Sequence, residues 1–486
     1  MKPLAVVEGA GEAVAERLDP RLRLELLCDD GSLRLFRSEV APQSKRAKPG
    51  DGVLVGAGTI DGRAVFCYAQ DSSVVGGSLG EAHADSIVRT LEMAGRAGAP
   101  VVGFVESGGA RMDEGVAALG GYGRIFRAQV ELSGKVPQIS VISGVSAGGG
   151  AYSPALTDFV VMAPDSSMFL TGPAVVQEVM GEDVSKAELG GPAIHSRNGV
   201  SHLEAESDID SVLRARELLS YLPQQSGAVR KSLPTVAPHS SDPSACVPEE
   251  PRKVYDVREV IGALADGGRA LELSSRFARN IVTSFGRIEG RSVGFVANQP
   301  RYLGGVIDAD ASQKAARFVR TCNAFGLPLV VLVDTPGFLP GTRQEQAGVI
   351  RHGAKLLHAF AEARVPRFTV VLRKAYGGGF ITMNSKDLGS DLALAWPNAE
   401  IGVVGAKQAV QIMNRRQIAE ASDPDQTTRE LADDYAAEHL GADVAARNGI
   451  IDELVMPAQT RDRLAWALST VGSQPLVGHD RGNIPL

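Results

Sequence analysis

Cysteine is scarce in this chain: four residues in 486, and no two of them form a CxxC pair. Zinc ribbons and disulfide frameworks need more closely spaced or more numerous cysteines, so neither is expected. The pattern fits a reducing compartment, and we expect a cytoplasmic protein. The four residues are Cys28, Cys67, Cys246 and Cys322.

Long apolar runs and runs of basic residues are also missing. No uninterrupted apolar stretch approaches the ~18 residues of a membrane span. The opening MKPLAVVEGAGEA lacks the apolar core of a signal peptide. The net charge of −7 argues against a nucleic-acid partner. We therefore expect neither membrane nor nucleic-acid association.

Common catalytic and metal-binding patterns are absent too. The sequence has no GxSxG motif, and no His or Asp partner is indicated for Ser107 or Ser146, which lie beside glycines. Five histidines follow no metal-ligand spacing, so we expect no metal in this chain and interpret them as ordinary core-edge or partly exposed residues. These are His83, His195, His202, His352 and His358. A base for catalysis would then come from a substrate or cofactor.

Glycine, in contrast, is abundant, with 55 residues, and it marks a pattern that occurs twice. In the first copy, PVVGFVESGGAR begins at Pro100 and PQISVISGVSAGGGAYS begins 37 residues later. In the second, PLVVLVDTPGF begins at Pro328 and PRFTVVLRKAYGGGFIT begins 38 residues later. Each copy reaches a triple glycine 11 residues after its second proline. The repeat predicts two copies of a strand–turn–helix–strand–turn unit, each with the same kind of site.

The repeat also predicts the domain organisation. A chain of this length is expected to form two domains. The segment from Pro223 to Pro251 holds many prolines and serines, which disfavour a packed element. We therefore expect an N-terminal domain at residues 1–225, a linker at 226–250 and a C-terminal domain at 251–486.

Short β-branched runs alternate with amphipathic stretches in both domains, which predicts α/β domains with parallel sheets and right-handed crossovers. The first ~60 residues are expected to add a helix and a small β-element, and QIAEASDPDQTTRELADDYAAEH to form an exposed helical pair. The predicted strands are GRAVFCYAQD, VVGFVES, QISVIS, DFVVMAP, SVGFVANQP, LVVLVD, FTVVLR and LALAWP, and the matching helices are EAHADSIVRTLEMAGRAG and ASQKAARFVRTCNAFG.

Four glycine-containing loops carry the candidate chemistry: residues 107–111, 147–150, 335–338 and 376–379. A tight turn accounts for an isolated glycine, but three in a row, twice, indicate that a ligand packs against bare backbone. Two backbone N–H donors aimed at one point form an oxyanion hole, which suits an enolate or a tetrahedral oxyanion.

Three charged residues beside these loops allow two interpretations each. Glu106 and Asp334 end predicted strands, and they are expected to cap the following helix rather than to act in acid–base catalysis. Arg111 is equally compatible with a phosphate contact and with a structural salt bridge.

The motifs as a whole closely resemble the β (carboxyltransferase) subunit of acyl-CoA carboxylases, the acetyl- and propionyl-CoA carboxylases of actinobacterial type. The resemblance runs from about residue 20 to the C-terminus. It rests on SGGARMDEGVAALGGYGRIF, ISGVSAGGGAYSPALTDFVVMAPDSSMFLTGP, ASQKAARFVRTCNAFGLPLVVLVDTPGFLPG and RKAYGGGFITMNSK. It implies two tandem crotonase-like (ββα-superhelix) domains related by duplication, a homo-oligomer, typically a hexamer built as a trimer of dimers, and a biotinylated α subunit as partner. In such dimers the N-domain of one subunit faces the C-domain of another.

The resemblance also implies roles for the loops. The amides of Gly148 and Gly149 would stabilise the thioester oxygen of an acyl-CoA, and those of Gly378 and Gly379 the ureido oxygen of biotin. Carboxybiotin would supply CO2, and the biotin anion would serve as the base. Residues of the CoA side would be Gly108, Gly109, Ala110 and Arg111, and those of the biotin side Tyr376, Gly377, Gly378 and Gly379.

Two residues after the second triple glycine bear on substrate choice. Phe380 and Ile381 stand where propionyl-specific members carry tyrosine and aspartate, and acetyl-type members carry isoleucine at the second position. The closing GNIPL also resembles the acetyl type. We therefore expect acetyl-CoA as a good substrate, with propionyl-CoA and butyryl-CoA accepted, to give malonyl-CoA and its homologues.

Three other functions remain open. The same loops would serve a biotin-dependent malonyl-CoA or methylmalonyl-CoA decarboxylase. A crotonase-like hydratase or isomerase would need a carboxylate base and would leave the second site without a purpose. A non-catalytic scaffold would not need intact glycine loops at both sites.

Overall fold

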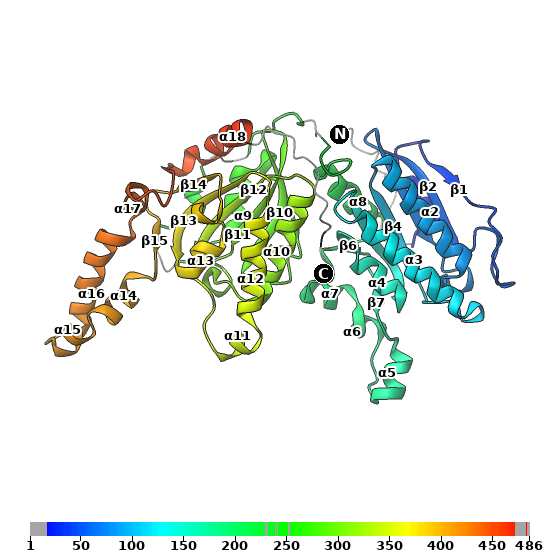
Figure 1. The fold of residues 1–486 in the computed structure, drawn as a ribbon, viewed down its shortest axis with the longest axis horizontal. Coiled ribbons are helices and arrows are strands. Elements are labelled where there is room, and N and C mark those ends of the chain that lie inside the picture. The colour runs from blue at the N-terminus through cyan, green and yellow to red at the C-terminus, as the bar shows by residue number, and fades with distance from the viewer. Residues whose placement is uncertain are drawn as a thin grey trace, which may run out of the picture. The chain divides into compact units, whose positions relative to one another are not determined.

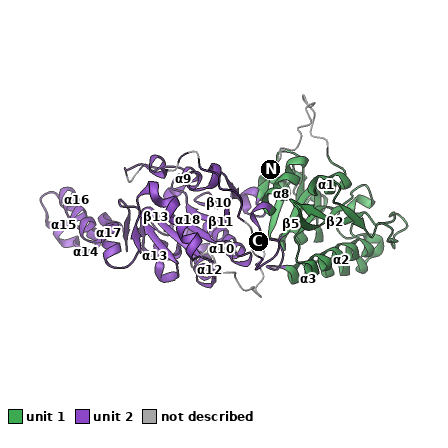
Figure 2. Cartoon of the chain, turned by 90° about the horizontal axis from the view of Figure 1, so that it is seen from above, with its two compact units in different colours: residues 1–132, 138–195, 203–219 green, residues 133–137, 196–202, 220–486 purple. Residues whose placement is uncertain are grey.

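The computed structural model describes residues 17–228, 232–238, 240, 242–250, 253–471 and 483. Residues 229–231, 239 and 241 of the predicted linker lie outside the described residues, as does most of the GNIPL segment. The chain divides into two compact units, which Figure 2 shows in two colours. Unit 1 comprises residues 1–132, 138–195 and 203–219, and unit 2 comprises residues 133–137, 196–202 and 220–486.

Unit 1 is built on an eight-stranded sheet with the order β1-β2-β3-β4-β5-β6-β8, in which β7 pairs with β5. Its strands are β1 (Arg34–Phe36), β2 (Val53–Ile60), β3 (Arg63–Gln70), β4 (Val101–Ser107), β5 (Gln138–Ala147), β6 (Phe159–Met162), β7 (Ser167–Phe169) and β8 (Leu203–Glu204). The helices are α1 (Pro20–Leu27), α2 (Glu81–Ala97), α3 (Val116–Leu132), α4 (Gly149–Ala155), α5 (Pro173–Met180) and α6 (Lys186–Gly190), with α7 (Pro192–Asn198) and α8 (Asp208–Tyr221) continuing into unit 2.

Unit 2 repeats this sheet, with the order β9-β10-β11-β12-β13-β14-β16 and with β15 paired to β13. Its strands are β9 (Ala270–Leu273), β10 (Ile281–Ile288), β11 (Arg291–Asn298), β12 (Leu329–Thr335), β13 (Arg367–Tyr376), β14 (Leu392–Ala395), β15 (Glu400–Gly402) and β16 (Glu453–Leu454). The helices are α9 (Val257–Leu264), α10 (Ala309–Ala324), α11 (Thr342–Gln346), α12 (Val349–Glu362), α13 (Gly377–Thr382), α14 (Ala406–Met413), α15 (Arg415–Glu420), α16 (Pro424–Tyr435), α17 (Ala442–Arg447) and α18 (Thr460–Thr470), several of which Figure 1 labels.

The predicted strands and helices are confirmed, but each sheet is mixed rather than parallel. The central strands pair in parallel, whereas β2–β3 and β10–β11 are antiparallel hairpins. Two-residue turns join these hairpins, and both turn residues have positive φ: Asp61 and Gly62 in one, Glu289 and Gly290 in the other. Such turns match the twist of antiparallel strands. The added β-element expected near the N-terminus therefore includes β2, which is the counterpart of β10.

The sheet of unit 2 is covered on one face by α9 and α18. Alternate residues of β12, Val330 and Leu332, join a core with Val260 of α9 and Leu464 of α18. Helices α10 and α12 pack against each other, and α10 also packs against β10. Because β12 carries helices on both faces, it is buried along its whole length.

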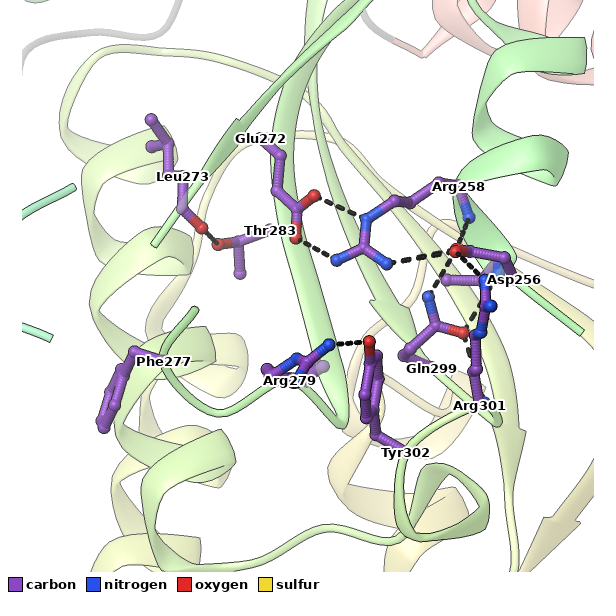
Figure 3. A network of polar contacts seen from close by, with 12 residues as sticks. Asp256, Arg258, Glu272, Leu273, Phe277, Arg279, Thr283, Gln299, Arg301 and Tyr302 are labelled. Carbon is purple, nitrogen blue, oxygen red and sulfur yellow. Dashed lines mark hydrogen bonds and ion pairs between the residues drawn. The ribbon is translucent and has the colours of Figure 1, made fainter. Parts of the chain in front are cut away.

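A polar network fixes the start of α9 to the edge strand β9 in unit 2 (Figure 3). The Arg258 guanidinium donates to both carboxylate oxygens of Glu272, at 2.6 and 2.9 Å, and also contacts Asp256. Asp256 in turn accepts from Gln299, at 2.6 Å, and caps α9 by accepting from the Arg258 N–H. The network joins α9, which covers one face of the sheet, to the edge strand β9.

The predicted exposed helical pair is confirmed as α15 and α16. Helix α16 begins with Pro424 in its first turn, and the Asp423 side chain caps it by accepting from the Gln426 N–H. Helix α14 packs against α16. The three helices project from the rest of unit 2, as Figure 1 shows.

Candidate active site

In each unit the chain leaves a central strand and enters a short helix through a glycine whose backbone conformation favours glycine over other residues. Gly148 follows β5 and has φ +57°, and Gly377 follows β13 and has φ +55°. Residues with a Cβ rarely adopt this region of backbone conformation. The first two glycines of each triplet therefore set the sharp turn and start the helix.

The Gly148 N–H differs from its expected role. It donates to the Phe169 carbonyl oxygen at 3.0 Å, so this donor is already engaged within the fold. The expectation that Gly148 and Gly149 together supply two donors is therefore corrected. Of the two, only Gly149 has an open N–H group, that is, one without an acceptor in the fold. In the described part of the chain, the N–H groups of Gly149 and Ala110 have no hydrogen-bond acceptor.

Ala110 and Gly149 belong to neighbouring loops. Ser107, which ends β4, pairs with Ser146 of β5. A Cβ placed on Gly109 would lie 3.5 Å from the Ala147 carbonyl oxygen. The loop after β4 therefore runs directly beside the turn that precedes α4, and each contributes one open N–H group.

Unit 2 repeats this arrangement with larger side chains. Phe338 takes the place of Ala110, because Ile307 bridges to Phe338 as Leu79 bridges to Ala110. A Cβ on Gly379 would lie 2.7 Å from the Gly337 Cα, so the two loops of unit 2 approach as closely as bare backbone permits.

The residues after the glycines of unit 2 are accessible. Gly378 is exposed, Phe380 is half-buried, and Ile381 in α13 is 50% exposed. The Gly378 N–H lies in the first turn of α13, where N–H groups have no acceptor within the helix. This stretch offers main-chain donors and an apolar side chain at the surface of the unit.

Of the two interpretations of Arg111, the structure shows the salt bridge. Its guanidinium is 1% exposed and contacts the carboxylates of Asp51 and, at 2.8 Å, Glu114. Burial raises the pKa of Asp51, although the hydrogen bond and the charge of Arg111 act in the opposite direction. Gly108 is exposed and Gly109 is buried, so the open part of this loop is its backbone rather than the arginine head group.

The expectation that Glu106 and Asp334 cap helices is wrong. The Glu106 carboxylate contacts the guanidinium groups of Arg17 and, at 3.7 Å, Arg23. The Asp334 carboxylate accepts from Arg373 Nε at 3.1 Å and is fully buried, which raises its pKa against the effect of the nearby cations. Each carboxylate is buried and paired with at least one buried arginine, Arg23 for Glu106 and Arg373 for Asp334.

A cavity of about 410 Å3 lies on the other side of Tyr376 in unit 2. The Tyr376 hydroxyl donates to Glu400, and burial together with this carboxylate raises the pKa of the phenol. The lining includes Lys374, Trp396 and Asn398 but none of the glycines at 377–379. The cavity is therefore separate from the glycine turn.

No helix among the residues that the structure describes is long and apolar enough to cross a membrane. No group of three or more His, Cys, Asp and Glu side chains among them could hold a metal ion. The histidines are scattered: His83 is fully buried and hydrogen-bonded, whereas the His358 side chain is 67% exposed.

Comparison with known proteins decides what these loops belong to. The carboxyl transferase domain model matches residues 14–480. This chain belongs to the carboxyl transferase family. The resemblance seen in the sequence is thereby confirmed, and the protein is a carboxyltransferase enzyme.

The relatives of this carboxyltransferase are full-length matches. The propionyl-CoA carboxylase carboxyltransferase subunit of Haloferax mediterranei is 46% identical, over 97% of this chain and 94% of the relative. The acetyl-/propionyl-coenzyme A carboxylase beta5 subunit of Mycobacterium tuberculosis is 44% identical, over 97% and 90%. The methylmalonyl-CoA decarboxylase subunit alpha of Propionigenium modestum is 42% identical, over 97% and 93%.

Solved structures give the same result for the fold. A transcarboxylase 12S crystal structure with methylmalonyl-coenzyme A and methylmalonic acid bound superposes with a TM-score of 0.92 at 45% identity. The match covers 97% of this chain and 92% of that one. The predicted fold of two duplicated crotonase-like domains is therefore confirmed for the carboxyltransferase.

One residue of the site escaped the sequence analysis. Tyr122 of α3 lies beneath both loops of unit 1: its ring packs on Gly149, and its hydroxyl lies 3.1 Å from Ser107 Oγ. Only its position within the GGYGRIF motif distinguished it, and helical periodicity cannot tell a core tyrosine from one that contacts a loop. The long-range packing of α3 brings it there.

Proposed function

We propose that this chain is the carboxyltransferase subunit of a biotin-dependent acyl-CoA carboxylase, with acetyl-CoA as a good substrate and propionyl-CoA and butyryl-CoA also accepted. One observation carries the proposal: each unit presents the same pair of loops with open main-chain N–H groups. Two such sites suit a reaction with two carbonyl-containing reactants, an acyl thioester and a ureido ring.

The acyl-CoA is assigned to unit 1, as the domain at residues 1–225. The N–H groups of Ala110 and Gly149 would donate to the thioester oxygen and stabilise the negative charge that develops on it as the α-carbon loses a proton. Preorganised backbone donors of this kind are worth ~3–4 kcal/mol each when one is removed. Gly108 provides exposed backbone along which the CoA chain would run, and the buried Gly109 fixes the loop beside it.

Biotin, attached to a partner subunit, is assigned to unit 2, as the domain at residues 251–486. The residues fit the ureido group, because Gly378 exposes its main chain and the buried Gly379 lets the facing loop approach where a Cβ would overlap it. Their N–H groups would donate to the ureido oxygen, and Tyr376 and Gly377 would hold the turn. Carboxybiotin, when bound, supplies the carboxyl group and the base, so the chain needs no side-chain base.

Ile381 supports the assignment of a short acyl chain. It extends from α13 directly after the glycines, is half-exposed, and offers no charge that could pair with a polar group. An apolar pocket discriminates one methylene by only ~1–3 kcal/mol, so related acyl groups would compete. Relatives are named for propionyl-CoA and for acetyl-/propionyl-CoA.

The proposed assembly follows the family. We propose a homo-oligomer, a hexamer in the manner of the structure titled as a transcarboxylase 12S hexamer, and a biotinylated α subunit as the partner. The four cysteines are free thiols, and we place the enzyme in the cytoplasm.

Decarboxylation of malonyl-CoA in the presence of free biotin tests the proposal without the partner subunit. The purified chain is expected to release CO2 from malonyl-CoA and methylmalonyl-CoA only when biotin or biocytin is added. Turnover that is independent of biotin, or turnover of an enoyl-CoA, would contradict it.

A second candidate is the carboxyltransferase part of a biotin-dependent malonyl-CoA or methylmalonyl-CoA decarboxylase. The relative in Propionigenium modestum, which bears that name, favours it. The two directions use the same loops. Carboxylation of acetyl-CoA by this chain with a carboxylated biotin carrier protein distinguishes them, because a dedicated decarboxylase would give little malonyl-CoA.

A further inference from the structure

A chain of hydroxyl contacts connects α3 to the loop after β4 in unit 1. The Tyr122 hydroxyl lies 3.1 Å from Ser107 Oγ, which in turn accepts the Gly109 N–H at 3.2 Å. Ser107 is fully buried, and Tyr122 is 5% exposed. Burial raises the pKa of Tyr122, so the phenol keeps its proton and can donate to Ser107.

The same tyrosine also contacts the second loop. A Cβ on Gly149 would lie 2.7 Å from the Tyr122 ring, closer than real contacts allow, so the ring lies flat against bare backbone. A Cβ on Gly150 would lie 3.5 Å from the Tyr122 hydroxyl oxygen and 3.3 Å from Ser107 Cβ. Tyr122 thus contacts the backbone at Gly149 directly and reaches the loop of Ala110 through the Ser107 hydroxyl.

The described residues of unit 2 form no such brace. Thr335 takes the place of Ser107 and accepts the Gly337 N–H at 3.2 Å. No phenol contacts the Thr335 hydroxyl among the described residues. The ring beside the helix start, that of Phe338, comes from the loop itself and lies in ordinary contact with Gly378.

We propose that Tyr122 and Ser107 are positioning residues for the acyl-CoA half of the reaction. Their contacts set the direction of the Ala110 N–H relative to the Gly149 N–H, so that both point at one thioester oxygen. The inference rests on the proposed function. In unit 1 the directions of the N–H groups depend on this side-chain brace, whereas in unit 2 they depend on direct contact between backbone segments.

Removal of one hydroxyl tests the brace. Tyr122→Phe keeps the ring on Gly149 but frees Ser107, and it is expected to lower kcat for biotin-dependent malonyl-CoA decarboxylation ~10-fold, less than the loss of a whole donor. KM values for malonyl-CoA and biotin are expected to stay within ~2-fold. Ser107→Ala, which also removes the acceptor of the Gly109 N–H, is expected to lower kcat at least as much. The double variant is expected to lower kcat no further than Ser107→Ala, because Tyr122 acts on the loop through Ser107.

Tyr68→Phe is the matched control. Tyr68 is also buried in unit 1, its hydroxyl contacts Ser153, and Gln129 holds Ser153 independently at 3.2 Å. This variant is expected to keep its kcat while losing a similar amount of stability.

A measurement independent of turnover completes the test. The backbone N–H groups in residues 104–112 are expected to exchange hydrogen for deuterium faster in Tyr122→Phe than in wild type, because the Ser107 acceptor is no longer fixed. Unchanged kcat and exchange, or additive losses in the double variant, would overturn the brace. Absence of biotin-dependent turnover in wild type would instead overturn the proposed function.

Discussion

Glu106 and Asp334 occupy the same place in the two units, and the N–H of each donates to a side-chain amide oxygen of the preceding strand. Glu106 donates to Gln70 at 2.9 Å, and Asp334 donates to Asn298 at 3.3 Å. The carboxylates themselves have different partners, arginines of the N-terminal segment in one case and Arg373 in the other. The repeat therefore keeps the main-chain geometry that leads into each loop while the charges beneath it vary.

Gly149 permits a direct test of the acyl-side loop. We expect Gly149→Ala to lower kcat ~100-fold or more, because the added methyl group would overlap the Tyr122 ring and displace the N–H. Steady-state decarboxylation of malonyl-CoA with saturating biotin measures this. Gly123→Ala, in α3 with open space around it, should retain full activity and gain up to ~1 kcal/mol of stability. Equal activity of the two variants would contradict the assignment.

Ile381 is expected to control the choice between acyl groups. Ile381→Asp should shift the ratio of kcat/KM for malonyl-CoA to that for methylmalonyl-CoA ~10-fold towards the larger substrate, within the range that one pocket residue commands. Ile209→Asp replaces an isoleucine of similar exposure in α8 and should leave the ratio unchanged. An unaltered ratio in Ile381→Asp would remove the basis for the acetyl preference.

His83 makes stability depend on pH. It is fully buried: its Nδ1 lies 2.9 Å from the Asp51 carbonyl oxygen, and its Nε2 lies 3.0 Å from the Gln70 amide nitrogen, so the neutral ring donates to the first and accepts from the second. Burial, assisted by Arg111, lowers the pKa of His83 to about 3.

Below its ordinary pKa of ~6.5 the unfolded chain binds this proton and the folded chain does not, so acidification from pH 6.5 towards 3 favours unfolding. Each such histidine contributes a slope of up to ~1.4 kcal/mol per pH unit. His202, whose burial lowers its pKa to about 3 as well, adds a second. Urea unfolding at pH 7, 6 and 5 should show a slope in His83→Gln that is smaller than that of wild type by up to ~1.4 kcal/mol per pH unit. An undiminished slope in this variant would refute the assignment.

Arg23 is expected to be a major determinant of the stability of unit 1. Its guanidinium, 1% exposed, donates to Asp208 at 2.7 Å and lies 3.7 Å from Glu106. Arg23→Met would leave two buried carboxylates without this cation, a loss of ~3–5 kcal/mol. The exposed pair of Arg127 and Glu131 is worth under ~1 kcal/mol, and Arg127→Ala serves as the control in thermal unfolding. A decrease in Tm of equal size in both variants would contradict the expected difference between the buried and the exposed arginine.

The sequence was sufficient to predict the strands, the amphipathic helices and the duplication, because apolar periodicity and repeated glycine spacing are local signals. The mixed sheets were missed, although Asp61–Gly62 is a recognisable hairpin turn. The ion pairs of Glu106 could not be predicted, because Arg17 and Arg23 approach it only after the chain has folded. The engagement of the Gly148 N–H by Phe169 and the contact of Tyr122 with Gly149 likewise depend on segments that are distant along the chain.

The donors of both sites belong to the peptide backbone, and this determines how the sites respond to mutation. Replacing Ala110 by another residue leaves its N–H in place, and among the usual residues only proline removes it. Alanine scanning would therefore leave these N–H groups intact and would detect only the effects of neighbouring side chains. The side chains that line such a site can therefore change while its chemistry stays the same. The sharp turns at Gly148 and Gly377 are the exception, because their backbone conformation favours glycine.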